Sequence, residues 1–90
     1  MGARFELGRV VATPGALEAL EASNVSPTEL LERHRSGDWG NVPREDAREN
    51  ERSVRQGFRI LSSYAAGKER IWIITEADRS STCLLLPSEY

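Results

Sequence analysis

Apolar and polar residues alternate near the start of the chain and again through its last third. Residues 4–12 show this two-residue period, which predicts a first strand. Residues 58–65, 70–75 and 81–86 are rich in β-branched, aromatic and aliphatic side chains. Short polar segments connect these three stretches, and short connections favour antiparallel hairpins. We therefore expect the last three strands to form an antiparallel meander.

Between the strands the apolar residues follow helical spacing. Thr13, followed by a proline, supplies the N-cap of a first helix that ends near residues 23–24. Ser26 and Glu29 are three positions apart, which predicts a capping box at the start of a second helix. Gly37 is placed to end that second helix.

A third helix is predicted over residues 44–56, with Pro43 before it and Gly57 after it. Its apolar face is thin, and Asn50 occupies the middle of that face. The full order is β-α-α-α-β-β-β, an α+β fold with the helices packed on one face of a small sheet. A chain of 90 residues fits one such domain, residues 1–90, and is too short for two.

The charge balance argues against a nucleic-acid partner. The 12 Lys and Arg residues are outnumbered by 14 Asp and Glu residues, which gives a net charge of −2, and the charges are mixed along the chain. Binding to phosphate backbones depends on an excess of basic residues, which is missing here. No apolar run approaches the roughly 18 residues of a membrane span, and the first residues lack the apolar core of a signal peptide.

Cys83 is the single cysteine, so no internal disulfide is possible and a reducing cytoplasm is the expected location. Because Cys83 lies inside an apolar strand, we expect a buried and unreactive thiol. The chain contains no glycine-rich nucleotide loop, no nucleophile elbow and no Cys or His metal motif. We therefore expect neither a cofactor nor a metal.

The strongest candidates for catalysis are His34 and Asp38, which are four positions apart at the end of the second helix. A histidine oriented by a carboxylate can act as a general base. The pair could also supply two metal ligands, but a catalytic metal site needs a third, which is not evident. The alternative is a histidine favoured by the helix dipole, with Asp38 bonding to the amides of the turn.

Two further residues have both a functional and a structural interpretation. Trp39 lies in a glycine-flanked turn, where it could anchor an interface or fold back as a plug for a small core. A buried Asn50 needs hydrogen-bond partners. We expect it to hold the backbone of the loop at residues 37–41, with contact to a ligand as the alternative.

The polar turn at residues 75–82 is the last candidate site. Glu76 or Asp78 could act as an acid or base, Arg79 could bind an anion, and Thr82 would line the same rim. The alternative is ordinary turn chemistry, in which these side chains bond to local amides and to each other. Hydroxyl side chains at residues 62–64 could face the same patch.

Four motifs carry a resemblance that covers nearly the whole chain. They are H-x-x-G-D-W-G from His34, N-E-R from Asn50, I-W-I-I-T-E-A-D-R-S-S-T from Ile71, and L-L-P-S-E-Y at the end. With the opening L-G-R-V-V-A-T-P-G-A-L-E-A-L they resemble a family of small bacterial proteins of unknown function that are often labelled plasmid-related. The resemblance implies carriage on mobile elements and transfers no catalytic role.

At the level of topology, a strand, helices and a closing meander are similar to the RelE/ParE-like toxins, which are ribosome-dependent ribonucleases or gyrase poisons. The ribonucleases use several Arg, Lys, His or Tyr residues near their last strands. Basic and phenolic residues occur here at Arg59, Lys68, Arg70, Arg79 and Tyr90, but acidic residues cancel their charge. Likeness of fold alone does not establish function.

Three functional hypotheses follow. The first is a small non-enzymatic regulatory protein of mobile elements that acts by protein–protein contact, for example as an antagonist of a host defence system, with Trp39 and the turn at 76–82 as its anchors. The second is a RelE/ParE-like toxin, and the third is a small hydrolase or lyase that uses His34 with Asp38. A homodimer by sheet extension is conceivable if residues 58–65 or 4–12 form an exposed edge strand.

Overall fold

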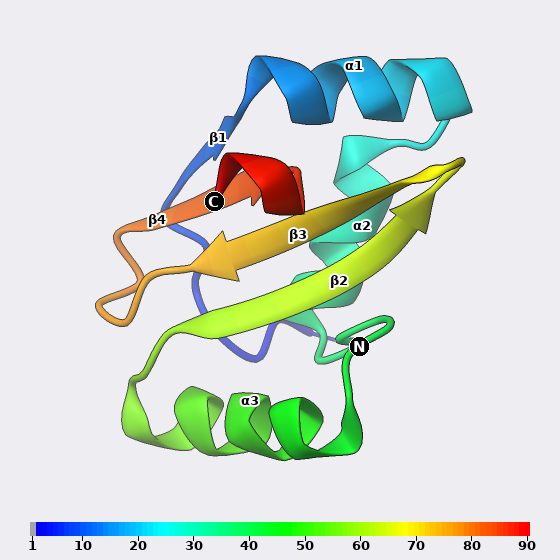
Figure 1. The fold of residues 1–90 in the computed structure, drawn as a ribbon. Helices are drawn as coiled ribbons and strands as arrows, with labels where there is room; N and C mark the ends of the chain where they lie inside the picture. The colour runs from blue at the N-terminus through cyan, green and yellow to red at the C-terminus, as the bar shows by residue number, and fades with distance from the viewer. Residues whose placement is uncertain (1) are drawn as a thin grey trace.

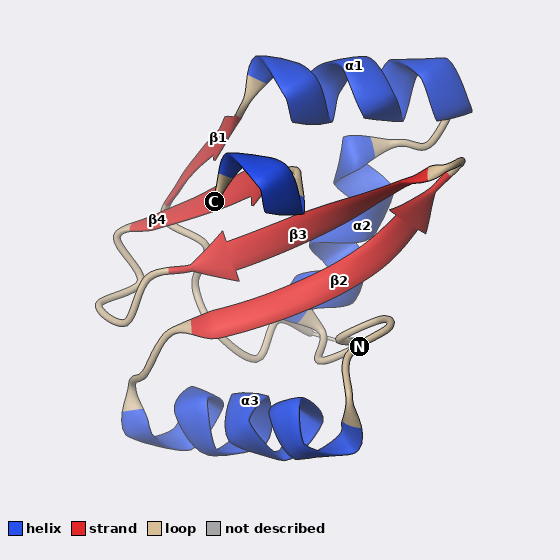
Figure 2. Ribbon diagram, in the orientation of Figure 1, coloured by secondary structure: helices blue, strands red, loops and turns tan. Residues whose placement is uncertain are grey.

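A computed structural model describes residues 2–90 and confirms the α+β fold. Three helices and a four-stranded sheet make up the chain, with a short 3₁₀ helix close to its end (Figures 1 and 2). The elements are β1 (Arg9–Ala12), α1 (Pro14–Ser23), α2 (Pro27–Arg35), α3 (Arg44–Gln56), β2 (Ile60–Ala66), β3 (Glu69–Thr75), β4 (Ser81–Leu85) and η1 (Pro87–Glu89).

The sheet has the order β1-β4-β3-β2 and is mixed. The meander is confirmed, since β2 pairs antiparallel with β3 and β3 antiparallel with β4. β1 instead runs parallel to β4, with Val11 opposite Cys83. The chain between these two strands contains the three helices and then β2 and β3. The first strand is also shorter than the predicted 4–12, and Gly8 before it has a positive φ of 66°. β1 and β2 are thus the two edge strands.

The predicted helix ends are mostly confirmed. The Thr13 hydroxyl accepts a hydrogen bond from the Ala16 amide, and the Ser26 hydroxyl accepts one from the Glu29 amide. Gly57 follows α3 in the left-handed conformation, as expected of a residue that ends a helix. The return bond from the Glu29 side chain, which would complete a capping box, is not among the hydrogen bonds of residues 2–90.

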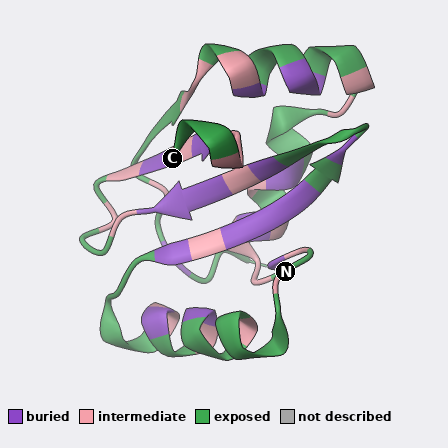
Figure 3. Cartoon of the chain, in the orientation of Figure 1, coloured by how far each residue is buried: buried purple, intermediate pink, exposed green. Residues whose placement is uncertain are grey.

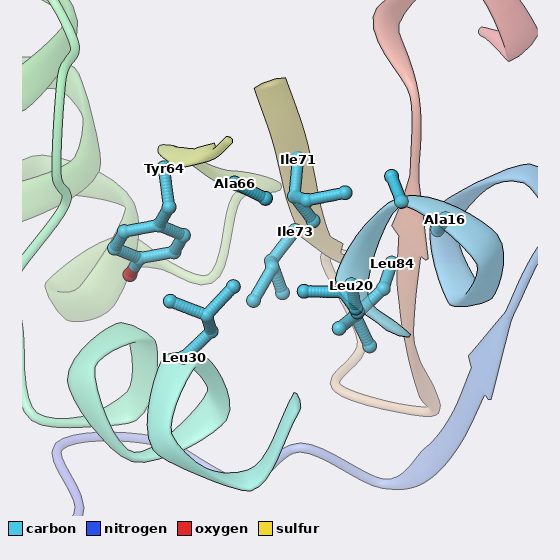
Figure 4. Packing of buried hydrophobic residues seen from close by; sticks show 9 residues of the cluster. Ala16, Leu20, Leu30, Tyr64, Ala66, Ile71, Ile73 and Leu84 are labelled. Carbon is cyan, nitrogen blue, oxygen red and sulfur yellow. The ribbon is translucent and has the colours of Figure 1, made fainter. Parts of the chain in front are cut away.

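One face of the sheet carries the main core. α1 and α2 cover this face, and Leu20 and Leu30 point from them toward Ile73 and Leu84 (Figure 4). The buried set is apolar and closely packed: Ala16, Ala19, Leu20, Leu30, Tyr64, Ala66, Ile71, Ile73 and Leu84. Burial of this much apolar surface is the main source of folding free energy in a domain of this size. In Figure 3 the core-facing positions of the strands and helices are coloured as buried.

α3 does not join α1 and α2 on that face, which corrects the expected arrangement. It runs along the outer edge of β2 (Figure 1). A second apolar cluster packs against α3. Phe5, Trp39 and Ile60 are buried in it, and Val54 of α3 packs against them. α3 has few apolar residues, so it can cover an edge and a small cluster but not a broad sheet face.

The opposite side of the sheet is the open face, defined here by Leu61, Trp72, Ile74, Cys83 and Leu85. η1 lies over part of this face, in front of β4 in Figure 1. The Tyr90 ring meets the Trp72 ring edge to face at 5.7 Å between centroids. No helix in the described residues is both long and apolar enough to cross a membrane.

Candidate functional site

His34 is fully buried at the centre of a chain of polar side chains. Its Nδ1 lies 2.6 Å from the Ser62 hydroxyl, and its Nε2 lies 2.9 Å from the Thr75 hydroxyl. Thr75 in turn lies 2.7 Å from the Thr82 hydroxyl, which donates to the Leu7 carbonyl at 2.7 Å. All four side chains are inaccessible to solvent, and we call them the buried polar chain.

The hydrogen positions in the buried polar chain follow from counting donors. Thr82 uses its one hydroxyl proton on the Leu7 carbonyl, so Thr75 must donate to Thr82. Thr75 then has no proton left for His34, and Nε2 of His34 must carry the proton that Thr75 accepts. Because burial lowers the pKa of His34 to about 3, the imidazole is neutral, so Nδ1 is the unprotonated nitrogen and Ser62 donates to it. This arrangement gives every member of the buried polar chain a partner.

The surroundings of His34 also oppose a positive charge. Burial lowers its pKa to about 3, and the positive charge of Arg79 acts in the same direction. Phe5 and Trp39 each meet the imidazole edge to face, with centroids 5.2 and 6.1 Å away. A general base needs access to its substrate and a pKa near the working pH, and His34 has neither.

The predicted pair of His34 and Asp38 does not form. Asp38 accepts from Arg33 Nε at 2.7 Å, and it also accepts from the Gly40 amide at 3.2 Å. The Arg33 guanidinium is the main cause that holds the pKa of Asp38 below its usual range. The turn chemistry named as the alternative is therefore confirmed for Asp38, whereas His34 takes its partners from the sheet.

Trp39 is the plug and not a surface anchor, since only 6% of it is exposed. Its ring lies near that of Phe5, with 6.1 Å between centroids, in the cluster that packs against α3. Its Nε1 donates to Glu51 at 3.1 Å, and the same carboxylate accepts two bonds from the Arg4 guanidinium. Trp39 thus fastens the loop after α2 to α3.

Asn50 is buried, as predicted, but its expected partner is wrong. The side chain accepts from the Leu61 amide at 3.1 Å and donates to the Leu61 carbonyl at 2.8 Å. These groups belong to the outer edge of β2 and not to the loop at residues 37–41. Asn50 therefore bonds to β2 as a neighbouring strand would, which is a structural role.

The loop at residues 37–41 nevertheless reaches the same edge. The Ser63 amide donates to the Trp39 carbonyl at 3.0 Å, and the Asn41 amide donates to the Ser63 carbonyl at 2.6 Å. Gly40 makes this approach possible, because its φ is 74° and a Cβ would overlap the Ser63 carbonyl and the Tyr64 ring. Asn50 and this loop together cap the outer edge of β2 at Leu61 and Ser63.

Arg79 binds carbonyl groups of the protein itself. Its guanidinium donates to Ser53 O and Phe58 O at 2.7 Å each and more weakly to two carbonyls of its own turn. The guanidinium lies 5.6 Å from the centre of the Phe5 ring. These bonds join the turn to the C-terminal end of α3, where a cation is favoured by the helix dipole. The contacts of Arg79 thus support a structural role, and the predicted anion site stays a prediction.

The other residues of the turn at 75–82 separate into surface and core. Glu76 pairs with Arg59 at 3.2 Å, and Asp78 accepts from the Ser80 amide at 3.0 Å. Thr82 belongs to the buried polar chain and cannot line a surface rim. The structure thus brings His34, Trp39, Arg79 and Thr82 together around packed side chains, while Glu76 and Asp78 lie outside at the surface.

The strand hydroxyls at residues 62–64 do not share one patch. Ser62 and Tyr64 point to the core face, where the Tyr64 hydroxyl donates to the Asp38 carbonyl at 2.6 Å, and Ser63 accepts from Arg70. Sequence reasoning missed that Ser62 and Thr75 are partners of His34. Their signal was a small hydroxyl at a core-facing position of an apolar strand, which needs a buried partner.

Cys83 is only partly buried, because it lies on the open face and not in the core. Burial is the main cause that raises the pKa of its thiol, and the carboxylates of Glu89 and Glu76 add to the effect. A raised pKa disfavours the reactive thiolate. The expected low reactivity therefore has support, although the expected full burial is wrong.

A surface hollow that the sequence did not indicate lies between α1 and the start of α2, with a volume of about 600 Å³. We call it the α1–α2 groove. Most of its lining is apolar: Pro14, Leu17, Leu20, Val25 and Pro27. Leu17 is half exposed at 51%. Glu18 and Glu21 also line the groove, and neither forms an ion pair within the described chain.

Charge is distributed unevenly around this groove. Residues 10–32 contain four glutamates and no Lys or Arg, although the whole chain is nearly balanced. An apolar floor beside carboxylates without partners is complementary to an apolar side chain with Lys or Arg next to it.

No cluster of three or more His, Cys, Asp or Glu residues that could hold a metal ion occurs in residues 2–90. No family model matches this chain, and no curated protein or solved structure was found to be similar to it.

Proposed function

We propose that this chain is a small non-enzymatic regulatory protein that acts in the cytoplasm by contact with another protein. The observation that supports this most is the α1–α2 groove, with its apolar lining, its half-exposed Leu17 and its carboxylates without partners. The groups that could have performed chemistry, above all His34 and Arg79, bind other parts of the same chain.

The groove indicates what the partner offers. An apolar side chain would enter between Leu17 and Val25, and neighbouring Lys or Arg residues would meet Glu18 and Glu21. The resemblance to plasmid-related proteins supports a role on mobile elements, where antagonism of a host defence system is the specific form that we propose. The partner then belongs to that host system.

The test is affinity capture from a bacterial lysate with matched variants. Leu17→Lys places a like-charged side chain where the partner's basic residues would lie, and it should abolish capture. Phe58→Lys is the control, because Phe58 is similarly exposed at 48% and is not among the groove residues. Capture should also weaken with added salt, since paired surface charges are screened. If no protein is retained by the wild type, or if Leu17→Lys retains it equally, the proposal fails.

The toxin alternative remains a prediction with its own test. Overexpression should then arrest growth, and Arg79→Ala or Tyr90→Ala should relieve the arrest. In the structure Arg79 donates to main-chain carbonyls and Arg59 donates to the Tyr90 hydroxyl at 2.9 Å. Growth without arrest would eliminate the toxin hypothesis.

A further inference from the structure

The two edge strands of the sheet differ in whether their outward main-chain groups have partners. On β2, Asn50 and the loop at 37–41 occupy the main-chain groups of Leu61 and Ser63. On β1, the only strand partner in the described chain is β4. Proteins usually cover or charge an exposed strand edge, because it can pair with another chain. Here the edge of β2 is covered at Leu61 and Ser63, and the edge of β1 is open.

The open edge can be defined by residue. The amides of Arg9 and Thr13 donate to the carbonyls of Ser80 and Leu84, toward β4. Main-chain groups alternate in direction along a strand, so the N–H and C=O groups of Val10 and Ala12 point away from the sheet. Val10 and Val11 extend to opposite faces and are 44% and 42% exposed.

We propose that this edge pairs with β1 of a second copy, in antiparallel orientation, to form a symmetric dimer with one continuous sheet. The register that fits places Val11 opposite Val11 of the second copy. Val10 then lies opposite Ala12 in each half, and each of these pairs can exchange two main-chain hydrogen bonds. Arg9 lies opposite Thr13, so no like charges face each other within the paired strands.

The covered edge of β2 explains why the second copy ends the assembly. A sheet with two open edges can add chains without limit, whereas a two-fold pairing through one open edge is closed. The contact between β1 strands is short, with four residues from each copy. Stable interfaces bury on the order of 1,200 Å² or more. A contact this short should therefore give a weak dimer that dissociates on dilution.

This dimer is independent of the α1–α2 groove and of the proposed function. Neither Val10 nor Val11 lines the groove, and Leu17 lies on α1, outside β1. A variant in one surface is therefore the control for the other. Failure of capture with a normal dimer would reject only the proposed function, and a monomer with normal capture would reject only the dimer.

Analytical ultracentrifugation over a range of concentrations tests the inference. The wild type should move from monomer to dimer as concentration rises. Val11→Lys places two ammonium groups against each other at the symmetry axis and should weaken association at least about tenfold, equal to about 1.4 kcal/mol. Leu17→Lys, with the same change of charge on an exposed residue, should dimerise as the wild type does. Circular dichroism checks that both variants are folded.

The register has a separate covalent test. In a Cys83→Ser background, Val11→Cys should form a disulfide-linked dimer under mild oxidation, because directly opposed strand positions allow disulfide geometry. Leu17→Cys in the same background is the control and should cross-link far more slowly. A wild type that stays monomeric at every concentration, an association that Val11→Lys does not weaken, or a cross-link that is equally fast in both variants would overturn the inference.

Discussion

His34 shows how the environment of a residue decides what its side chain can do. The imidazole could have been a base, but the structure gives Nε2 a hydrogen-bond acceptor, Nδ1 a donor and the ring two aromatic neighbours. Protonation at Nδ1 would leave the Ser62 hydroxyl without its acceptor. A buried polar network of this kind stabilises one packing arrangement only when every member is satisfied. The role of His34 is therefore to connect α2 to β2 and β3.

The pKa of His34 leads to a prediction about stability and pH. Its folded value is about 3, below the value of roughly 6.5 expected in the unfolded chain. Between these values the unfolded state binds a proton that the folded state does not, so the free energy of unfolding falls as pH falls below about 6.5. The slope should approach about 1.4 kcal/mol per pH unit between pH 6 and 5, before most carboxylates titrate. Urea unfolding at successive pH values measures it.

His34→Gln is the control for that slope, because glutamine keeps hydrogen-bonding groups but does not titrate. This variant should be less stable at pH 7 and should lose the dependence on pH in this window. A wild type whose stability is constant from pH 7 to pH 5 would show that His34 is not held neutral by the fold.

The proton positions in the buried polar chain give a second prediction. Nitrogen-15 NMR should find His34 as the neutral tautomer with the proton on Nε2. The reason is that Thr82 donates to the Leu7 carbonyl, so Thr75 must donate to Thr82 and accept from His34. Thr82→Val removes the hydroxyl that fixes the proton of Thr75, and it leaves the Leu7 carbonyl without a partner. The free energy of unfolding should fall by about 1–3 kcal/mol. Ser81→Val, on the neighbouring and partly exposed residue, is the control. A proton on Nδ1 would contradict the assignment.

At the level of single residues, the sequence predicted burial better than it predicted partners. The burial of Asn50 followed from its place in an apolar stripe, and the plug was one of the two interpretations of Trp39 in its glycine-flanked turn, beside the interface anchor. The partners of Asn50 and His34, and the Ser53 and Phe58 carbonyls that Arg79 bonds, could not be predicted, because these contacts depend on where α3 and β2 are placed. Local spacing placed Asp38 one turn from His34, but the nearer Arg33 is a stronger partner for a carboxylate.

Among the elements, β2 is the clearest case of a strand completed by side chains and a loop. The Asn50 amide bonds to both main-chain groups of Leu61, and the loop at 37–41 bonds to both groups of Ser63. α3 thus contributes this amide to the edge of β2, in addition to its packing against Phe5, Trp39 and Ile60. A charged helix with a thin apolar face suits that position, because its other faces remain in water.

Replacing Asn50 tests this role. Asn50→Ala should destabilise the protein by about 1–3 kcal/mol, since both Leu61 groups lose a partner. Hydrogen exchange at the Leu61 amide should accelerate more than exchange at residues that pair with β3. Glu49→Ala is the control, because Glu49 is an exposed neighbour on α3. If Asn50→Ala leaves the exchange of Leu61 unchanged, the edge of β2 is protected in another way.

The elements themselves were largely predictable because their signals are local. Caps at Thr13 and Ser26 and the glycine after α3 set the helix ends, and the apolar runs set β2, β3 and β4. The parallel pairing of β1 was not predictable, because a four-residue strand carries no sign of which neighbour it joins. The position of α3 depended on the same missing long-range information.

Across the whole molecule, the two faces of the sheet are covered unequally. α1 and α2 bury the core face, whereas the open face has only η1 and Tyr90 over it in the described chain. In the proposed dimer the two-fold axis between the antiparallel β1 strands runs perpendicular to the sheet. The open faces of both copies therefore lie on the same side of the continuous sheet. Because only η1 and Tyr90 lie over the open face in the described chain, they determine how much of its apolar surface is exposed to water.

Tyr90 provides the test of that control. Its ring packs edge to face on Trp72, and its hydroxyl accepts from Arg59 at 2.9 Å. Tyr90→Ala should uncover Trp72, so in a Trp39→Phe background the tryptophan emission should shift to longer wavelength and quenching by acrylamide should increase. Tyr90→Phe keeps the ring contact and loses only the bond to Arg59, so its spectrum should stay close to that of the parent. Because aromatic contact of this kind contributes about 0.5–1.5 kcal/mol, Tyr90→Ala should remain folded. Equal spectra in the two variants would mean that the chain end does not cover the open face in solution.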